Sequence, residues 1–152
     1  MEQANDDLQL VTRRLINAPR ILVFEAFMDP HHIGLWWGPN GFTTTTISMD
    51  PKVGGTWRFT MHGPDGTDYP NVIEYTDIVK PERICYDHGD DTGPVFKAVI
   101  EFEEIDNKTN ITLRTLHASR EQLEAMKKHG AVEGARQTLE RFERYISPEF
   151  HK

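Results

Sequence analysis

The 152-residue sequence lacks several features that mark particular classes of protein. Cys85 is its one cysteine, so the chain can form neither an intramolecular disulfide nor a thiolate metal cage. No apolar run approaches the length of a membrane span, and the first ten residues are acidic and polar where a secretory signal is basic and then apolar. These absences predict a cytoplasmic protein with no membrane span.

Positive charge is also in short supply. The chain has 17 Lys and Arg residues against 24 Asp and Glu residues, and its formal net charge is −7. Because clustered Lys and Arg carry most of the affinity for nucleic acids, this balance argues against a nucleic-acid partner. The length, and a hydrophobic content of 38%, are typical of one domain with its own core. We expect a single domain over residues 1–152, with its core at about residues 8–146.

Patterns that bind metals or perform catalysis are equally scarce. His31 and His32 are adjacent, so their side chains diverge on a helix, and no third ligand follows at a suitable spacing. Helix capping and solvation explain this pair better than a metal does. Cys85 lies in a predicted strand with no basic residue beside it, which indicates a small core residue rather than a nucleophile. The glycines of "VGGTW" open a strand and not a helix, which argues against a phosphate-binding loop. We therefore predict no catalytic residues, no metal site and no cofactor.

Hydrophobic periodicity and turn residues divide the chain into short elements. Residues 8–16 alternate as in a strand, and two short helices follow, separated by Asp29 and Pro30. From Phe42 onward six short alternating segments are joined by turn residues, which predicts an antiparallel meander.

The last element is the longest. From Ser119, a credible N-cap, residues 119–146 follow the pattern of one amphipathic helix, which we expect to lie across the concave side of the sheet. Gly130 and Gly134 lie inside this pattern, and an interior glycine costs about 1 kcal/mol relative to alanine. The alternative is a break at Gly130 into the segments "SREQLEAMKKHG" and "AVEGARQTLERFERYI".

Several motifs, in their order and spacing, resemble a known family. "DPHHIGLWWGP", "KVGGTWRF", "GPDG", "VIEYTDIVKPERICY" and "EGARQTLERFERYI" are similar to signatures of proteins related to the C-terminal domain of the activator of heat shock protein 90 ATPase. These proteins belong to the START-like (SRPBCC) superfamily, and the resemblance covers about residues 8–146. It implies an α+β, helix-grip (Bet v 1-like) fold, in which a curved antiparallel sheet of about seven strands surrounds a long C-terminal helix and two short helices follow strand one. One departure is Ala135, where family members usually have Trp, so the helix should leave a larger space beneath it.

The predicted fold suggests a cavity. A strongly curved sheet around one helix cannot be filled evenly at both ends, so we expect a space between sheet, helix and short-helix region. Adjacent side chains cannot share one face, so Trp36 and Trp37 must point in different directions. We expect Trp36 to pack inward with Phe24 and Phe27, and Trp37 to form the pocket mouth with Phe42. In the alternative, both indoles only fill the core.

Strand alternation predicts an inner sheet face that is mainly aromatic and apolar, with a few polar groups such as Tyr75, Tyr86, His88 and His117. His88 has a simpler alternative as an exposed strand end beside "GDD". The loop of residues 38–41 could act as a hinge beside the pocket. The predicted ligand pocket is lined by Trp37, Phe42, Phe59, Met61, Ile73, Tyr75, Tyr86, His88, Phe96, Ala98, Met126, Ala131 and Ala135.

Three functions from different classes fit these features. The leading one is non-enzymatic binding of a small apolar or aromatic ligand in the cavity. The second function, which the resemblance implies, is interaction with a chaperone. The activator of heat shock protein 90 ATPase itself acts together with a further domain. The third is an enzyme of the cyclase or hydratase type found on related folds, which would need a buried base with a partner, such as His88 with Asp87 or Glu74. The sequence leaves the ligand's identity and the oligomeric state open.

Overall fold

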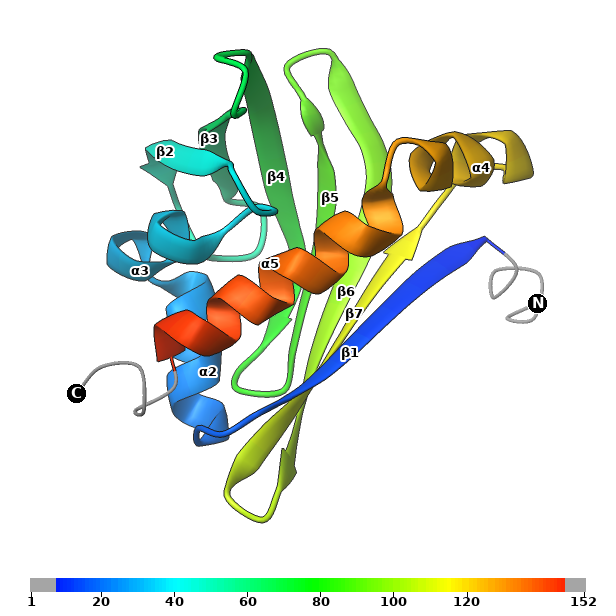
Figure 1. The fold of residues 1–152 in the computed structure, drawn as a ribbon. Helices are drawn as coiled ribbons and strands as arrows, with labels where there is room; N and C mark the ends of the chain where they lie inside the picture. The colour runs from blue at the N-terminus through cyan, green and yellow to red at the C-terminus, as the bar shows by residue number, and fades with distance from the viewer. Residues whose placement is uncertain (1–7, 147–152) are drawn as a thin grey trace.

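A seven-stranded antiparallel sheet is the main layer of the computed structural model, which describes residues 8–146 (Figure 1). Its strand order is β1-β7-β6-β5-β4-β3-β2, so each strand from β2 to β7 lies beside the next one, and β1 closes the far edge beside β7. The predicted meander and strand number are confirmed. The strands are β1 (Gln9–Ile16), β2 (Thr43–Met49), β3 (Thr56–His62), β4 (Asp68–Val79), β5 (Arg83–Asp90), β6 (Gly93–Ile105) and β7 (Lys108–Leu116).

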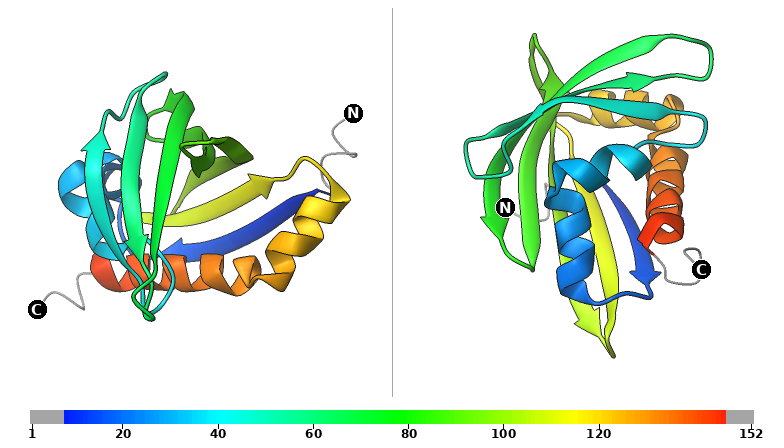
Figure 2. Two further views of the ribbon diagram at one scale, coloured as in Figure 1. Left: turned by 90° about the horizontal axis from the view of Figure 1, so that it is seen from above. Right: turned by 90° about the vertical axis from the view of Figure 1, so that its left-hand side faces the viewer.

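Two short helices follow β1, as predicted: α2 (Arg20–Met28) and α3 (Pro30–Trp36). Asp29 ends the first helix and caps the second, because its carboxylate accepts a hydrogen bond from the backbone N–H of His31 at 2.8 Å. Pro30 occupies the first turn of α3, where a missing N–H costs nothing. Figure 2 shows the sheet curving around the helices, with α2 and α3 on the same side of it as the C-terminal helix α5 (Ala131–Ile146).

The C-terminal helical region is broken, so the prediction of one continuous helix over residues 119–146 is wrong and the alternative break at Gly130 is confirmed. Helix α4 (Arg120–Lys128) begins after its N-cap Ser119, and α5 follows as a separate helix. Gly130 has φ +86°, a left-handed conformation that favours glycine. The residue thus ends α4 and lets α5, the longest described helix at 16 residues, turn back across the sheet.

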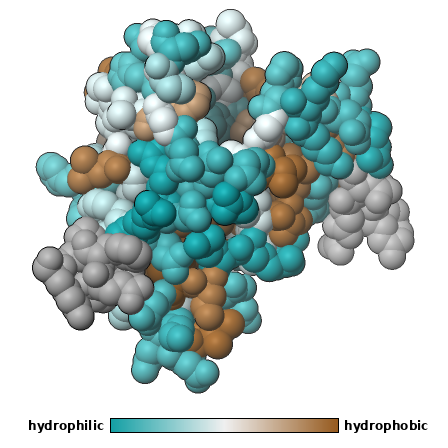
Figure 3. Space-filling view, in the orientation of Figure 1, coloured by the Kyte–Doolittle hydropathy of each residue, from teal (hydrophilic) through white to brown (hydrophobic). Residues whose placement is uncertain are grey.

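An aromatic cluster attaches the C-terminal half of α5 to the rest of the core. The ring of Phe142 lies 4.6 Å from that of Trp36 and 4.9 Å from that of Phe27, and Phe27 lies 5.2 Å from Phe102 on the sheet. Trp36 is 1% exposed and packs on Phe27, as expected, while Phe24 lies against Phe102 in the same core. Figure 3 shows that the opposite, outer surface of α5 is mainly hydrophilic.

Two alanine substitutions test the helix break. A side chain at Gly130 would meet no atom within 4 Å, so only the positive φ opposes it, and Gly130→Ala should lower the free energy of unfolding by about 1 kcal/mol. Gly134→Ala is the matched control: it lies inside α5, its new methyl group would approach only Pro39 at 4.0 Å, and stability should rise by about 0.5–1 kcal/mol. Urea unfolding of both variants measures the difference. A gain in stability for Gly130→Ala would contradict the proposed reason for the break.

Candidate functional site

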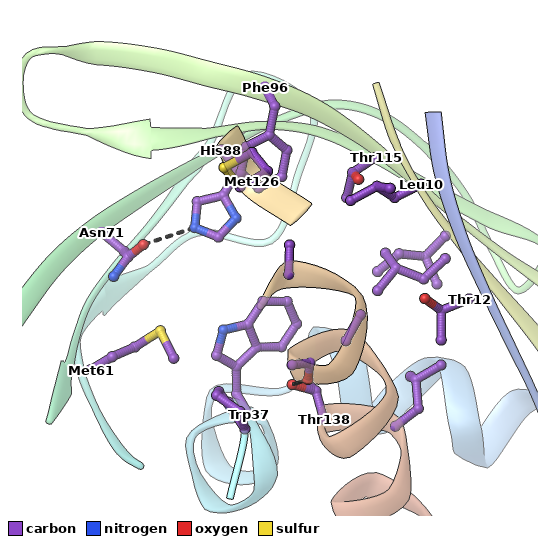
Figure 4. A pocket seen from close by; sticks show the side chains of 18 of the residues that line it. Leu10, Thr12, Trp37, Met61, Asn71, His88, Phe96, Thr115, Met126 and Thr138 are labelled. Atoms are coloured by element: carbon purple, nitrogen blue, oxygen red, sulfur yellow. Dashed lines mark hydrogen bonds between the residues drawn. The ribbon is translucent and has the colours of Figure 1, made fainter. Parts of the chain in front are cut away.

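A pocket of about 380 Å³ lies between the first half of α5, the inner face of the sheet and the loop that follows α3 (Figure 4). Its position follows from the sequence of α5. Ala131, Gly134, Ala135 and Thr138 repeat at intervals of three and four residues, so they share one helix face, and all of them line the pocket. The larger Leu139 continues this stripe. The first half of α5 therefore presents small side chains to the pocket, and larger side chains follow toward its C-terminal end.

The sheet supplies the opposite wall from several strands. Apolar and aromatic side chains make up most of it, together with a few neutral polar groups, and none of the lining residues is Asp, Glu, Lys or Arg. Since burying an unpaired charge is costly, such a wall favours uncharged molecules. The sheet residues that line the pocket are Leu10, Thr12, Met61, Asn71, Tyr86, His88, Phe96, Ile100, Leu113 and Thr115.

His88 is the main titratable group in this wall. Its Nε2 lies 2.9 Å from Oδ1 of Asn71, and its ring lies 4.9 Å from that of Phe96. Burial lowers the pKa of His88 to about 4, so the imidazole is neutral at physiological pH. The residue is half-buried and lines the pocket, and so it is not the exposed strand end that the sequence also allowed.

Two tyrosines lie side by side on the inner face of the sheet, where Tyr75 of β4 pairs with Tyr86 of β5. Burial raises the pKa of both hydroxyl groups, so both stay protonated at physiological pH. Tyr86 lines both the main pocket and a separate void of about 10 Å³, whereas Tyr75 lines the void and not the main pocket.

The loop after α3 forms the rim. Trp37 is half-buried, lines the pocket and packs edge-on against Trp57 at 5.2 Å. The loop beside it is fastened to α5, since Nη1 of Arg141 donates hydrogen bonds to the carbonyl oxygens of Gly38 at 2.7 Å and Pro39 at 2.8 Å. The Asn40 N–H also donates to the side chain of Gln137 at 3.0 Å. These bonds hold the loop of residues 38–41 against α5 at the edge of the pocket.

The structure brings together one part of the predicted residue set and separates the other. Phe42 packs near Tyr69, with ring centroids 6.0 Å apart, and Phe59 is fully buried in a stack on Trp57 at 3.8 Å. Ile73 and Tyr75 line the small void, and Ala98 is buried in the core. These five do not line the main pocket. Those that do are Trp37, Met61, Tyr86, His88, Phe96, Met126, Ala131 and Ala135.

Sequence reasoning missed the contribution of the β1 edge. Leu10 and Thr12 come from β1, and Leu113 and Thr115 from β7, which pairs with it. The alternation of side chains in both segments would have identified these residues if the pairing of β1 with β7 had been predicted. The spacing that includes Ala131 and Ala135 also contains Thr138, and that signal was present in the sequence.

Other candidate groups lie outside the pocket. Cys85 was expected in the core but is half-buried, alternating with the inward-facing Ile84 and Tyr86, and burial raises the pKa of its thiol. His117 is buried, does not line the pocket, and contacts the Thr115 hydroxyl at 3.0 Å. Within residues 8–146 no three His, Cys, Asp or Glu side chains come together as metal ligands. No helix in the same range is long and apolar enough to cross a membrane.

Comparison with known proteins agrees with this fold. Residues 17–147 match the family described as Activator of Hsp90 ATPase homolog 1-like protein. The chain belongs to this family. A search of curated proteins found no match to the chain.

Several bacterial structures share the fold of this family member. Protein Ms6760 from Mycobacterium smegmatis is 26% identical, with a TM-score of 0.84 over 95% of this chain and 93% of that one. A protein from Arthrobacter aurescens is 29% identical, with a TM-score of 0.87 over 93% and 87% of the two chains. Protein NE0264 from Nitrosomonas europaea is 22% identical, with a TM-score of 0.86 over 96% and 98%. The names of these three proteins state no ligand or activity.

The environment of His88 predicts how its ring titrates. Its pKa is lowered from 6.5 to about 4 in the native protein, whereas the unfolded chain takes up the proton near 6.5. The contribution of His88 to stability is therefore present above pH 6.5 and is lost as the pH falls toward about 4. Ring signals of His88, followed by NMR between pH 3 and 8, should titrate near the lower value. A midpoint near 6.5 would mean that the ring is open to water.

Because the sequence has no set of metal ligands at a suitable spacing, we predict that the protein binds no transition metal. Purified, untagged protein should contain no stoichiometric transition metal, because His31 and His32 have no third ligand at a suitable spacing. Elemental analysis measures this directly. One equivalent of zinc that disappears in His31→Ala or His32→Ala would show the prediction to be wrong.

Proposed function

We propose that the protein binds a small, predominantly apolar or aromatic ligand in the pocket between α5 and the sheet, without catalysing a reaction on it. The observation that carries this proposal is the stripe of small residues on α5 that faces an uncharged sheet wall. The pocket volume of about 380 Å³ lies within the range of about 300–1,000 Å³ common to small-molecule sites.

The enzymatic alternative gains less support from the geometry. It needs a carboxylate partner for His88, but the hydrogen-bond partner of this ring is the amide of Asn71. Asp87 instead lies 3.1 Å from the amino group of Lys97. A neutral histidine held by an amide is better suited to recognising a ligand than to transferring protons.

A chaperone as partner is suggested by the family name alone. The family name concerns activation of a chaperone ATPase, and membership of the family does not by itself give this chain that partner. The pocket is a feature of the chain itself, so the small-ligand function is the one proposed here.

Filling the pocket from the helix tests the proposal. In Ala135→Trp, the new indole enters the empty space, so the free energy of unfolding should change little, since overpacking penalties of about 1–3 kcal/mol arise where a site is already full. The variant should also lose the binding of Nile red, an uncharged apolar dye, that the unmodified protein shows. Thermal unfolding and dye fluorescence titrations measure the two effects.

Val132→Trp is the matched control, because Val132 is on the same helix, is 52% exposed and does not line the pocket. It should leave dye binding unchanged. Severe destabilisation of Ala135→Trp would mean that the site is already packed. Unchanged stability with unchanged dye binding would place the dye site elsewhere.

A further inference from the structure

A series of hydrogen bonds in the pocket wall fixes the tautomer of His88. Nδ2 of Asn71 donates to the backbone carbonyl oxygen of Tyr69 at 2.9 Å, so the amide presents its oxygen to the histidine. This Oδ1 lies 2.9 Å from Nε2 of His88. An amide oxygen can only accept, and therefore Nε2 must carry the ring proton.

The other ring nitrogen of His88 is consequently an acceptor. Because burial keeps the imidazole neutral, Nδ1 has a lone pair and no proton. No group within residues 8–146 donates a hydrogen bond to it. Figure 4 shows His88 bonded to Asn71 on one side, with its second nitrogen directed into the pocket. An acceptor that faces a largely apolar pocket favours a bound molecule that supplies a donor.

The surroundings restrict the donor further. Tyr86, which neighbours His88 on the inner face of β5, lines the same pocket. None of the lining residues is Asp or Glu, so an ammonium group finds no counter-ion there, and His129 is the one lining residue besides His88 that can carry a positive charge. A neutral donor on an apolar body is the group that suits this wall.

We infer that the pocket selects uncharged, largely apolar ligands that carry a hydroxyl group, and that this hydroxyl donates a hydrogen bond to Nδ1 of His88. The inference rests on the proposed function, since it names the ligand class of the same pocket. The amide of Asn71 acts as a positioning group, because it holds the acceptor nitrogen toward the ligand.

Three probes with the same ring system test this selection at pH 7. 2-Naphthol has a hydroxyl donor, 2-methoxynaphthalene has none, and 2-naphthoate is an anion. Isothermal titration calorimetry should show that 2-naphthol binds about tenfold more tightly than 2-methoxynaphthalene, the effect of about one hydrogen bond. 2-Naphthoate should bind more weakly than 2-naphthol, because its ionised carboxylate has no proton to donate to Nδ1 of His88.

Substitution of the acceptor should remove the preference. In His88→Phe, the affinity for 2-naphthol should fall about tenfold to that of 2-methoxynaphthalene, whose own affinity should not fall. His62→Phe is the control: His62 does not line the pocket, and its change should leave both affinities as they are. Should His88→Phe fail to fold, nitrogen NMR of the unmodified protein replaces it. Nδ1 of His88 should be unprotonated, and its signal should move on addition of 2-naphthol but not of 2-methoxynaphthalene.

The outcomes separate this inference from the proposed function. Equal affinities for 2-naphthol and 2-methoxynaphthalene, or a protonated Nδ1, would overturn the selection for a donor and leave ligand binding standing. Failure of both probes and of Nile red to bind would remove the proposed function and this inference together.

Discussion

The packing of Phe142 against Phe27 and Trp36 is the interaction on which the rest of the structure depends. All three side chains are buried, and they join α5 to both short helices at one end only. An ion pair of 2.7 Å between Arg14 of β1 and Glu143 strengthens the same end. Because the first half of α5 offers only small side chains to the sheet, the space beneath it is not filled and the pocket stays open.

The pocket owes its chemistry to which residues the strands turn inward. Alternation directs the charged side chains of β5 and β6 away from the helix, as for Asp87 and Lys97, which pair with each other. The polar groups that remain inside are neutral, and their hydrogen bonds are partly satisfied by one another. A wall of this kind can orient a ligand through one or two directed bonds while most of the contact area remains apolar.

Much of the fold could be predicted from the sequence because its signals are local. Alternation marked the strands, Asp29 and Pro30 separated the short helices, and Gly130 marked a place where a helix could break. Whether the helix actually broke there depended on how α4 and α5 pack, which sequence periodicity does not reveal. The α5 side of the pocket was equally accessible, because Ala131 and Ala135 repeat at helical spacing.

The sheet side of the pocket was harder to predict because it depends on pairing between distant segments. Leu10 and Thr12 line the site only because β1 lies beside β7, at the edge opposite to β2. Phe59 was placed on the correct face, but its stack on Trp57 removes it from the pocket. The partner of His88 was also unforeseen, since Asn71 reaches it across the β4–β5 pair from a strand 17 residues earlier. Alternation shows which face a residue occupies, whereas side-chain packing decides whether that residue meets the cavity.

The central claim is that an open apolar space exists beneath the first half of α5. Xenon occupies apolar cavities without needing any specific contact, so crystals under xenon pressure test this claim most directly. The account predicts ordered xenon between Ala135 of the helix and Ile100 and Leu113 of the sheet. A crystal without xenon at this position, in which α5 rests directly on these strands, would contradict it.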